Sequence, residues 1–256
     1  MNPSTIIVAG RQLEAQYLTG EPGYPALVLL HEGLGSIALW KNVPQELVRR
    51  TGCPVLAYSR YGNGFSDILQ EPRRPSYMHD EALASLPAVL EAFGVDDVLL
   101  IGHSDGASIA LISAGKIGAR LRGIVAEAPH VFVEQLSVES IARAKFAFEA
   151  GNLRERMAPY HQDVDRTFYG WNDIWLDAAF RDWDIRDLLA AIDVPMLLIQ
   201  GSDDEYGTPA QLDAIRNGAR NARVDTLLLA QCGHAPHRDR PQMTLDAVAA
   251  FVKSVL

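Results

Sequence analysis

The chain has 256 residues, of which 48% are hydrophobic and 21% are charged, and its formal net charge at pH 7 is −9. A chain of this length and composition can bury a sizeable core, as one large α/β domain or two small ones, and is not disordered throughout. The acidic balance argues against nucleic acid and membranes as partners, since both require a basic surface, although surplus acid also favours solubility alone.

Short apolar runs alternate with longer amphipathic stretches along most of the chain. The first two runs, at 5–8 and 12–17, alternate apolar with polar residues and predict a short antiparallel lead-in. Strands buried on both faces, as in a parallel sheet, are predicted at 26–30, 55–58, 98–101, 123–127, 196–200 and 224–229. Amphipathic helices are predicted at 39–50, 77–93, 107–117, 210–218 and 242–255. Pro87 should kink or interrupt the second helix. This order predicts a three-layer α/β sandwich with a mostly parallel sheet.

One interval, 130–192, breaks the alternation because it has helix signals and no strand signal. Gly151 can end one helix there, and Asn152 with Glu155 can begin another. Ten of the twenty aromatic residues lie in this interval, and most of them are expected to hold it together. We therefore predict a core domain of residues 1–129 and 193–256 and a helical cap of residues 130–192, inserted before the last two strands.

A serine lies in a Gly-x-Ser-x-Gly pentapeptide directly after the strand predicted at 98–101. A strand that runs through a sharp turn into a helix can lift one hydroxyl above the sheet edge, and the flanking glycines relieve the crowding there. Ser104 is therefore the candidate nucleophile. The pentapeptide alone is weak support, since such a short pattern also arises by chance.

A serine nucleophile needs a base and a group that orients the base. Asp203 and Asp204 follow the strand predicted at 196–200, and His234 follows the last predicted strand, so all lie at the edge where Ser104 emerges. The two aspartates could also be ordinary turn residues. His237 is a rival base, although the glycine before His234 favours a tight turn that presents its ring.

Backbone donors for an oxyanion are expected from two loops. One is the N–H of Asp105, the residue after the nucleophile, and the other comes from the glycine-rich loop at 31–36. Gly33 is the preferred second donor, with Leu34 as the alternative.

The segments at 30–36, 59–67, 102–106, 201–204 and 233–234 together resemble the α/β-hydrolase superfamily. The resemblance runs from about residue 26 to the end of the chain and is strongest to the capped esterase, lipase and carbon–carbon hydrolase branch. It implies a Ser104, Asp204 and His234 triad, because the family's acid usually stands three residues after a glycine, here Gly201. Asp203 is the fallback acid.

Two residues depart from the family pattern. Glu32 stands where the family usually has glycine, and Asp105 stands where it often has an apolar residue. Both would oppose an oxyanion unless paired or turned away, so we expect at least one to meet a cation such as Arg60. If either faces the cavity, the pocket should prefer neutral or cationic substrates. We take Glu32, Trp171 and Trp175 as candidate pocket residues.

The predicted function is a carboxylesterase-like serine hydrolase that cleaves small neutral or apolar esters through an acyl-enzyme. No cofactor is expected, and Cys232, His234 and His237 match no common metal pattern. The alternatives are a carbon–carbon bond hydrolase of the meta-cleavage type and a non-catalytic ligand-binding protein on the same fold. Two cysteines and the absence of a signal-peptide pattern or a spanning apolar run favour a cytoplasmic protein. Oligomeric state is not predicted.

Overall fold

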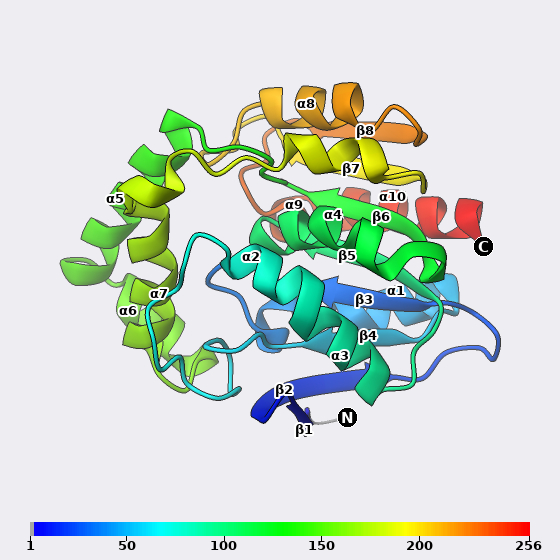
Figure 1. The fold of residues 1–256 in the computed structure, drawn as a ribbon, viewed down its shortest axis with the longest axis horizontal. Helices are drawn as coiled ribbons and strands as arrows, with labels where there is room; N and C mark the ends of the chain where they lie inside the picture. Colours follow the sequence, from blue (N-terminus) through cyan, green and yellow to red (C-terminus); the bar gives the residue numbers. More distant parts are fainter. Residues whose placement is uncertain (1–2) are drawn as a thin grey trace.

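The computed structural model describes residues 3–256 and contains one eight-stranded sheet in the order β1-β2-β4-β3-β5-β6-β7-β8. The antiparallel lead-in consists of β1 (Ser4–Val8) and β2 (Arg11–Leu18), and β2 also pairs antiparallel with β4. The remaining pairs are parallel and join β3 (Ala26–Leu30), β4 (Val55–Tyr58), β5 (Val98–His103), β6 (Leu121–Glu127), β7 (Met196–Gly201) and β8 (Val224–Leu229). The predicted mostly parallel sheet with an antiparallel start is confirmed (Figure 1).

Successive strand residues point to opposite faces, so the sheet builds two separate cores. Leu27 and Leu29 of β3 pack with α1 (Val43–Thr51) and α10 (Pro241–Val255) on one face. Val28 and Leu30 pack on the other face with the helices α2 (Tyr77–Asp80), α3 (Leu86–Ala92), α4 (Asp105–Ile117) and α8 (Ala210–Gly218). Helices therefore cover both faces of the sheet (Figure 1), and the predicted three-layer sandwich is confirmed.

Two predicted helices are divided in the structure. The helix predicted at 77–93 becomes α2, one π-helical turn η2 (Glu81–Ser85) and α3. Pro87 lies at the start of α3, where its missing N–H requires no acceptor, so the expected interruption is found just before it. The helix predicted at 39–50 is a 3₁₀ turn, η1 (Ile37–Trp40), followed by α1, which has Pro44 in its first turn.

The strand prediction at 224–229 is right in position but wrong about burial. β8 pairs only with β7 among residues 3–256, so it forms an edge of the sheet. Asp225 and Thr226 are exposed, and Leu228 is 55% exposed. The apolar residues of β8 resemble those of the central strands. Composition alone therefore did not distinguish this edge strand from a buried one.

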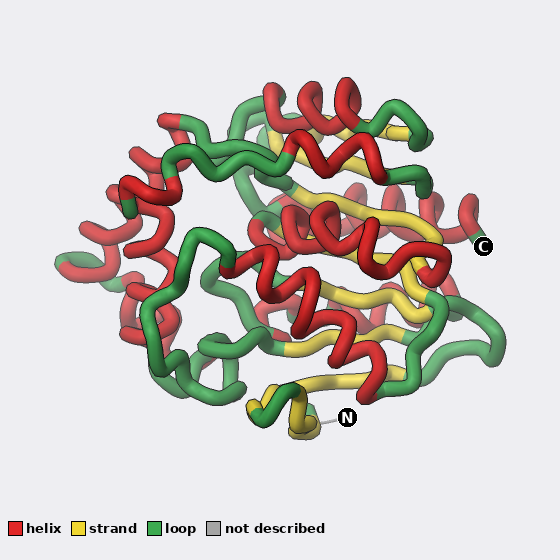
Figure 2. Tube along the Cα trace, viewed as in Figure 1, coloured by secondary structure: helices red, strands yellow, loops and turns green. Residues whose placement is uncertain are grey.

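The segment at 130–192, which we call the covering segment, contains α5 (Gln135–Glu149), α6 (Leu153–Met157), η4 (Ala158–Tyr160), α7 (Val164–Leu176), η5 (Ala178–Phe180) and η6 (Arg186–Ala191). Its helices α5 to α7 lie beyond one end of the sheet (Figures 1 and 2). Phe148 stacks on Phe168 with ring centroids 3.8 Å apart, and Phe180 stacks on Trp183 at 5.4 Å. Many of its rings therefore pack against one another. Of the helices in residues 3–256, none has the length and apolar composition required to cross a membrane.

Candidate active site

Ser104 occupies the sharp turn between β5 and α4, with φ 53° and ψ −119°. A β-carbon at Gly102 would lie 2.3 Å from the carbonyl oxygen of Gly106, and one at Gly106 would lie 1.9 Å from that of Leu30. Only glycine fits these two approaches of backbone to backbone. The pentapeptide thus creates the space that the turn needs, and the turn holds Ser104 in a conformation rarely adopted by a residue with a side chain.

The structure brings Ser104, His234 and Asp204 into one hydrogen-bonded series at the carboxyl ends of β5, β7 and β8. Ser104 Oγ lies 2.9 Å from His234 Nε2, and His234 Nδ1 lies 2.8 Å from Asp204 Oδ1. If Nδ1 carries the ring proton and donates it to the carboxylate, Nε2 can accept the proton of the serine hydroxyl. The two hydrogen bonds therefore orient one histidine between an acid and an alcohol.

The Asp204 carboxylate is held by its own turn as well as by His234. The backbone N–H groups of Tyr206 and Gly207 donate to its Oδ1 at 2.9 and 3.2 Å, and Gln200 Nε2 donates to its Oδ2 at 3.2 Å. Burial raises the pKa of this carboxyl, but the hydrogen bond and charge of His234 and the other donors outweigh burial and lower the pKa to about 2. Asp204 is therefore an anion at neutral pH.

The rival residues lie elsewhere. His237 Nδ1 is paired with Glu127 Oε2 at 2.8 Å, and both side chains are buried. Asp203 is exposed and accepts a hydrogen bond from Ser202 Oγ at 3.0 Å. Neither rival contacts the Ser104 hydroxyl or the His234 ring through any hydrogen bond between residues 3 and 256, so the structure distinguishes the two aspartates that share one turn.

The expected backbone donors are unengaged. Asp105 is the first residue of α4, and Gly33 and Leu34 lie in the loop after β3. Within the described chain, the N–H groups of these three residues donate to no other group. Asn63 Nδ2 holds the loop by donating to the carbonyl oxygens of Gly33 and Gly35, at 3.0 and 3.1 Å. The helix dipole of α4 adds partial positive charge beside Asp105.

Both unusual acids have partners. Asp105 Oδ2 accepts a hydrogen bond from the Tyr77 hydroxyl at 2.6 Å and lies 3.9 Å from Arg60 Nη2, so the expected pairing with Arg60 is found. Glu32 instead has two other partners, 3.5 Å away at His103 Nδ1 and 4.0 Å away at an Arg238 nitrogen. Burial raises the pKa of Glu32, but these neighbours, chiefly His103, hold it well below its usual range.

His103 links the loop after β3 to the loop that carries His234. Its Nε2 lies 2.7 Å from the carbonyl oxygen of His234, and its Nδ1 faces Glu32. The Nε2 contact is a hydrogen bond, whereas the Nδ1 contact with the Glu32 carboxylate, at 3.5 Å, is an ion-pair distance. Burial lowers the pKa of His103, yet Glu32 and the other neighbours raise it above its ordinary value. The ring thus lies between the loop after β3 and the loop that carries His234, in contact with both.

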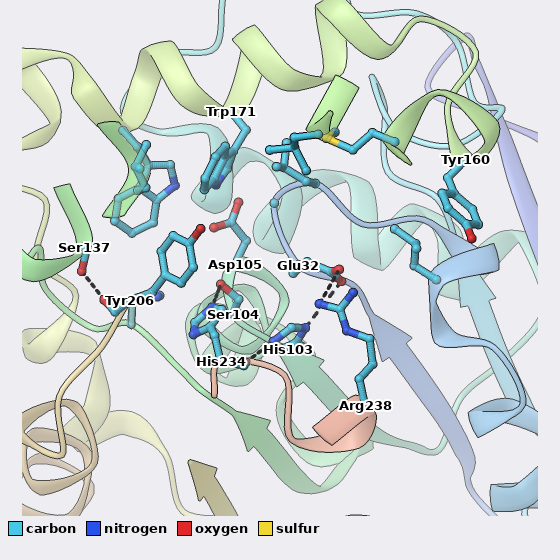
Figure 3. Close-up of a pocket in the computed structure, with 18 of the residues that line it drawn as sticks. Glu32, His103, Ser104, Asp105, Ser137, Tyr160, Trp171, Tyr206, His234 and Arg238 are labelled. Atoms are coloured by element: carbon cyan, nitrogen blue, oxygen red, sulfur yellow. Dashed lines mark hydrogen bonds and ion pairs between the residues drawn. The ribbon is translucent and has the colours of Figure 1, made fainter. Parts of the chain in front are cut away.

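A cavity of about 490 Å³ opens above Ser104 and is closed on its far side by the covering segment. Figure 3 shows Trp171 above the side chains of Ser104 and His234. The predicted pocket residues Glu32, Trp171 and Trp175 all line this cavity. Its apolar lining consists of Leu34, Leu39, Ile141, Leu153 and Met157, together with these tryptophans. The volume suits a small organic molecule.

The sequence interpretation missed several polar lining residues, namely Lys41, His130, Ser137, Arg156, Tyr160, Tyr206 and Arg238. His130 and Tyr206 follow the ends of β6 and β7, so the same strand-end argument that found Asp204 could have found them. Burial, followed by the charge of His234, lowers the pKa of His130 to about 3, and burial raises that of Tyr206 to about 12. Both side chains are therefore neutral at physiological pH.

The covering segment is hydrogen-bonded to the functional loops. Ser137 Oγ donates to the carbonyl oxygen of Tyr206 at 2.5 Å, and Ser140 Oγ donates to that of Glu205. On another side, His161 Nε2 lies 3.1 Å from the carbonyl oxygen of Leu34. These bonds reach both the turn that carries Asp204 and the loop that carries the candidate oxyanion donors.

The possible metal ligands are engaged in other contacts. Cys232 is a buried thiol whose pKa burial raises to about 11, and the neighbouring histidines are paired with Asp204 and Glu127. Over residues 3–256, no group of three or more His, Cys, Asp or Glu side chains is placed to hold a metal ion.

A model of the alpha/beta hydrolase family matches residues 27–247. A 2-succinyl-6-hydroxy-2,4-cyclohexadiene-1-carboxylate synthase of Salmonella typhimurium is 23% identical over 271 residues, which cover 94% of this chain and 99% of that protein. The sn-1-specific diacylglycerol lipase ABHD11 of Mus musculus is 24% identical, over 94% of this chain and 85% of that protein.

Solved structures show the same fold. An enol-lactonase from Burkholderia xenovorans superposes with a TM-score of 0.74 and 20% identity over 98% of this chain and all of that chain. A thermophilic esterase from Thermogutta terrifontis gives a TM-score of 0.75 and 18% identity over 100% of this chain and 99% of that chain. From the family match over most of its length, the chain belongs to the alpha/beta hydrolase family.

Proposed function

We propose that this protein is a carboxylesterase-like serine hydrolase that cleaves small carboxylic esters through a covalent acyl-enzyme. The observation that carries the proposal is the hydrogen-bonded series from Ser104 through His234 to Asp204 at the floor of a cavity. We assign Ser104 as the nucleophile, His234 as the general base and Asp204 as the acid that orients His234.

The geometry supports two half-reactions. In the first, His234 Nε2 takes the proton of Ser104 while Oγ bonds to the carbonyl carbon of the ester. The protonated ring then gives this proton to the departing alkoxide as the carbon–oxygen bond breaks. In the second, His234 takes a proton from water, whose oxygen attacks the acyl carbon, and returns the proton to Ser104 as the acid leaves. Asp204, anionic throughout, stabilises the charged ring.

The negative oxygen formed in each half-reaction needs donors. We assign the N–H groups of Asp105 and Gly33 to this task, with Leu34 as the alternative to Gly33, because no described residue uses them otherwise. A well-placed donor of this kind contributes about 3 kcal/mol to transition-state stabilisation. The pairing of the Asp105 side chain with Tyr77 and Arg60 offsets the negative charge that it brings next to this position.

We also propose that residues 130–192 act as a cap on a core formed by 1–129 and 193–256. Support comes from the cavity, which is lined by Ser104 and His234 of the core and by Trp171 and Trp175 of residues 130–192. Figure 3 shows Trp171 above Ser104 and His234. On this proposal the cap supplies substrate contacts, and the strand-end loops supply the chemistry.

The proposal is tested by labelling the intact protein with a fluorophosphonate, which reacts with activated serines. We expect stoichiometric labelling at Ser104, abolished in Ser104→Ala and unchanged in Ser254→Ala, a control on α10. Absence of labelling in the wild-type protein would overturn the proposal that it is a serine hydrolase and would favour a ligand-binding role. Faster turnover of a meta-cleavage diketone than of an aryl ester would instead identify a carbon–carbon bond hydrolase.

A further inference from the structure

The cavity has two chemically different ends on either side of Ser104. Figure 3 shows Ser137 and Tyr206 on one side of Ser104, and Tyr160 and Arg238 on the other. The first end is aromatic and uncharged, since Trp175 and the neutral His130 also line the cavity and pack against each other. The second end, which we call the basic end, contains Tyr160 and Arg238, and Lys41 belongs to it through its hydrogen bond to the Tyr160 hydroxyl. We assign Arg156 to the same end because it lines the cavity from α6, directly before the turn η4 that contains Tyr160.

Three side chains at the basic end are cationic, and among the described residues only Arg238 has an acidic partner within 4.0 Å. Lys41 Nζ donates to the hydroxyl of Tyr160 at 3.0 Å, which is an uncharged partner. The Arg156 guanidinium makes no hydrogen bond or ion pair with any described residue and is exposed. Arg238 is 4.0 Å from Glu32, at the limit of an ion pair. These three residues come from three separate segments, so the cavity rather than one helix face collects them.

The acids that line the same cavity do not cancel this charge. Asp105 is buried and already faces Tyr77 and Arg60. Glu32 is one carboxylate beside three cationic side chains of the lining, and it lies closer to His103 Nδ1 than to Arg238, at 3.5 against 4.0 Å. In a chain with a net charge of −9, a cavity with surplus positive charge attracts anions selectively.

Resting on the proposed function, we infer that the natural substrate is an ester that carries a carboxylate, and that Lys41, Arg156 and Arg238 bind this carboxylate at the basic end. Arginine suits the task, because its planar fork matches the two oxygens of a carboxylate. The uncharged part of the substrate then lies toward Tyr206, with the ester carbonyl over Ser104. This assignment replaces the neutral or apolar ester that the sequence led us to expect.

The test compares matched esters. One pair is the mono-4-nitrophenyl ester of glutarate and its methyl ester, which differ in the acyl carboxylate. The second pair carries the carboxylate, free or methylated, on the phenol. We expect kcat/KM to favour the anionic member of one pair by about tenfold or more, and the preference to shrink between about 20 and 500 mM salt.

Three variants locate the carboxylate site. Arg156→Ala, Lys41→Ala and Arg238→Ala should each lower the anionic-to-neutral ratio of kcat/KM by about three- to tenfold, mainly through a higher KM. Arg156→Lys should keep most of the preference. Arg220→Ala, which removes an exposed arginine in the turn after α8 that does not line the cavity, should leave kcat/KM for both esters unchanged.

Failure of this inference is distinguishable from failure of the proposed function. Equal kcat/KM within both ester pairs, with Ser104 still labelled by the fluorophosphonate, would overturn the carboxylate site and leave the hydrolase in place. Equal losses on both esters in the three variants would do the same. If no ester is cleaved, calorimetric binding of glutarate decides: binding lost in Arg156→Ala supports the site, and no binding overturns it.

Discussion

The strand-end loops hold their side chains by hydrogen bonds, whereas the covering segment leaves one charged side chain of the cavity lining, that of Arg156, exposed. Asp204 accepts hydrogen bonds from His234, Gln200 and two backbone N–H groups. Arg156 of the covering segment makes none with a described residue through its side chain. The proposed function assigns the loops the geometry of the reaction, and it assigns substrate selection to the covering segment together with Lys41 and Arg238.

The largest expected effect comes from removing the side chain of His234 or Asp204 from the strand-end loops while the covering segment stays unchanged. His234→Ala should lower kcat by about four to six orders of magnitude, and Asp204→Ala by about four, because the residues act as one unit. Steady-state kinetics on an aryl ester measures the loss, and circular dichroism checks the fold. A loss of less than about tenfold in either variant would contradict the assigned roles.

The next largest effect is expected where the loop after β3 packs against the covering segment, at Gly33 and Trp171. A β-carbon at Gly33 would lie 2.1 Å from Trp171 Cδ1, so Gly33→Ala must push the donor loop away from the covering segment. We expect kcat to fall about a hundredfold as a backbone donor moves out of place. Adding Trp171→Ala makes room and should restore part of kcat, which a double-mutant cycle measures. No restoration would show that the clash is not the cause.

Acid should destabilise the protein through two buried groups beside the cavity, His130 and Asp204. The pKa of His130 falls to about 3 and that of Asp204 to about 2, both below their unfolded values. The unfolded chain then binds more protons, so their stabilisation is complete above about pH 6.5 and is lost as the pH falls. We expect Tm to decrease from pH 7 to pH 4, and less steeply in His130→Asn. Equal slopes would exclude His130 as a contributor.

The smallest effect is expected within the same turn as the acid. Asp203 is exposed and bonds only to Ser202 through its side chain among the described residues, so Asp203→Asn should change kcat less than about twofold. Kinetics of Asp203→Asn beside Asp204→Asn makes the comparison. A large loss in the first variant alone would reverse the choice between the two aspartates.

The loops were predictable from the sequence because parallel strands bring their carboxyl ends to one edge. That rule predicts that Ser104, His234 and the pair Asp203 and Asp204 lie near one another. It could not separate Asp203 from Asp204 by itself, because one residue in a turn decides which carboxylate points at the histidine. The resemblance to a family supplied that choice, and the contacts in the structure agree with it.

For the covering segment, the sequence predicted the helical secondary structure but not most of the side chains that face the cavity. Helix periodicity indicates which residues are apolar together, but not which face meets a cavity formed by another part of the chain. Trp171 and Trp175 were found among the candidates because bulky rings are obvious in a sequence. Arg156 and Tyr160 were not, since exposed polar residues on short helices usually face solvent alone.

The open edge at β8 has a consequence for how molecules of this protein meet. The outer side of an edge strand presents backbone donors and acceptors that another strand could pair with, and the exposed Leu228 adds apolar surface beside them. Asp225 lies in the same strand with its carboxylate exposed and an ion-pair distance of 3.3 Å to Arg223. A strand of a second molecule that paired with β8 would have to accommodate the charges of Arg223 and Asp225. These charges therefore disfavour extension of the sheet and aggregation at this edge.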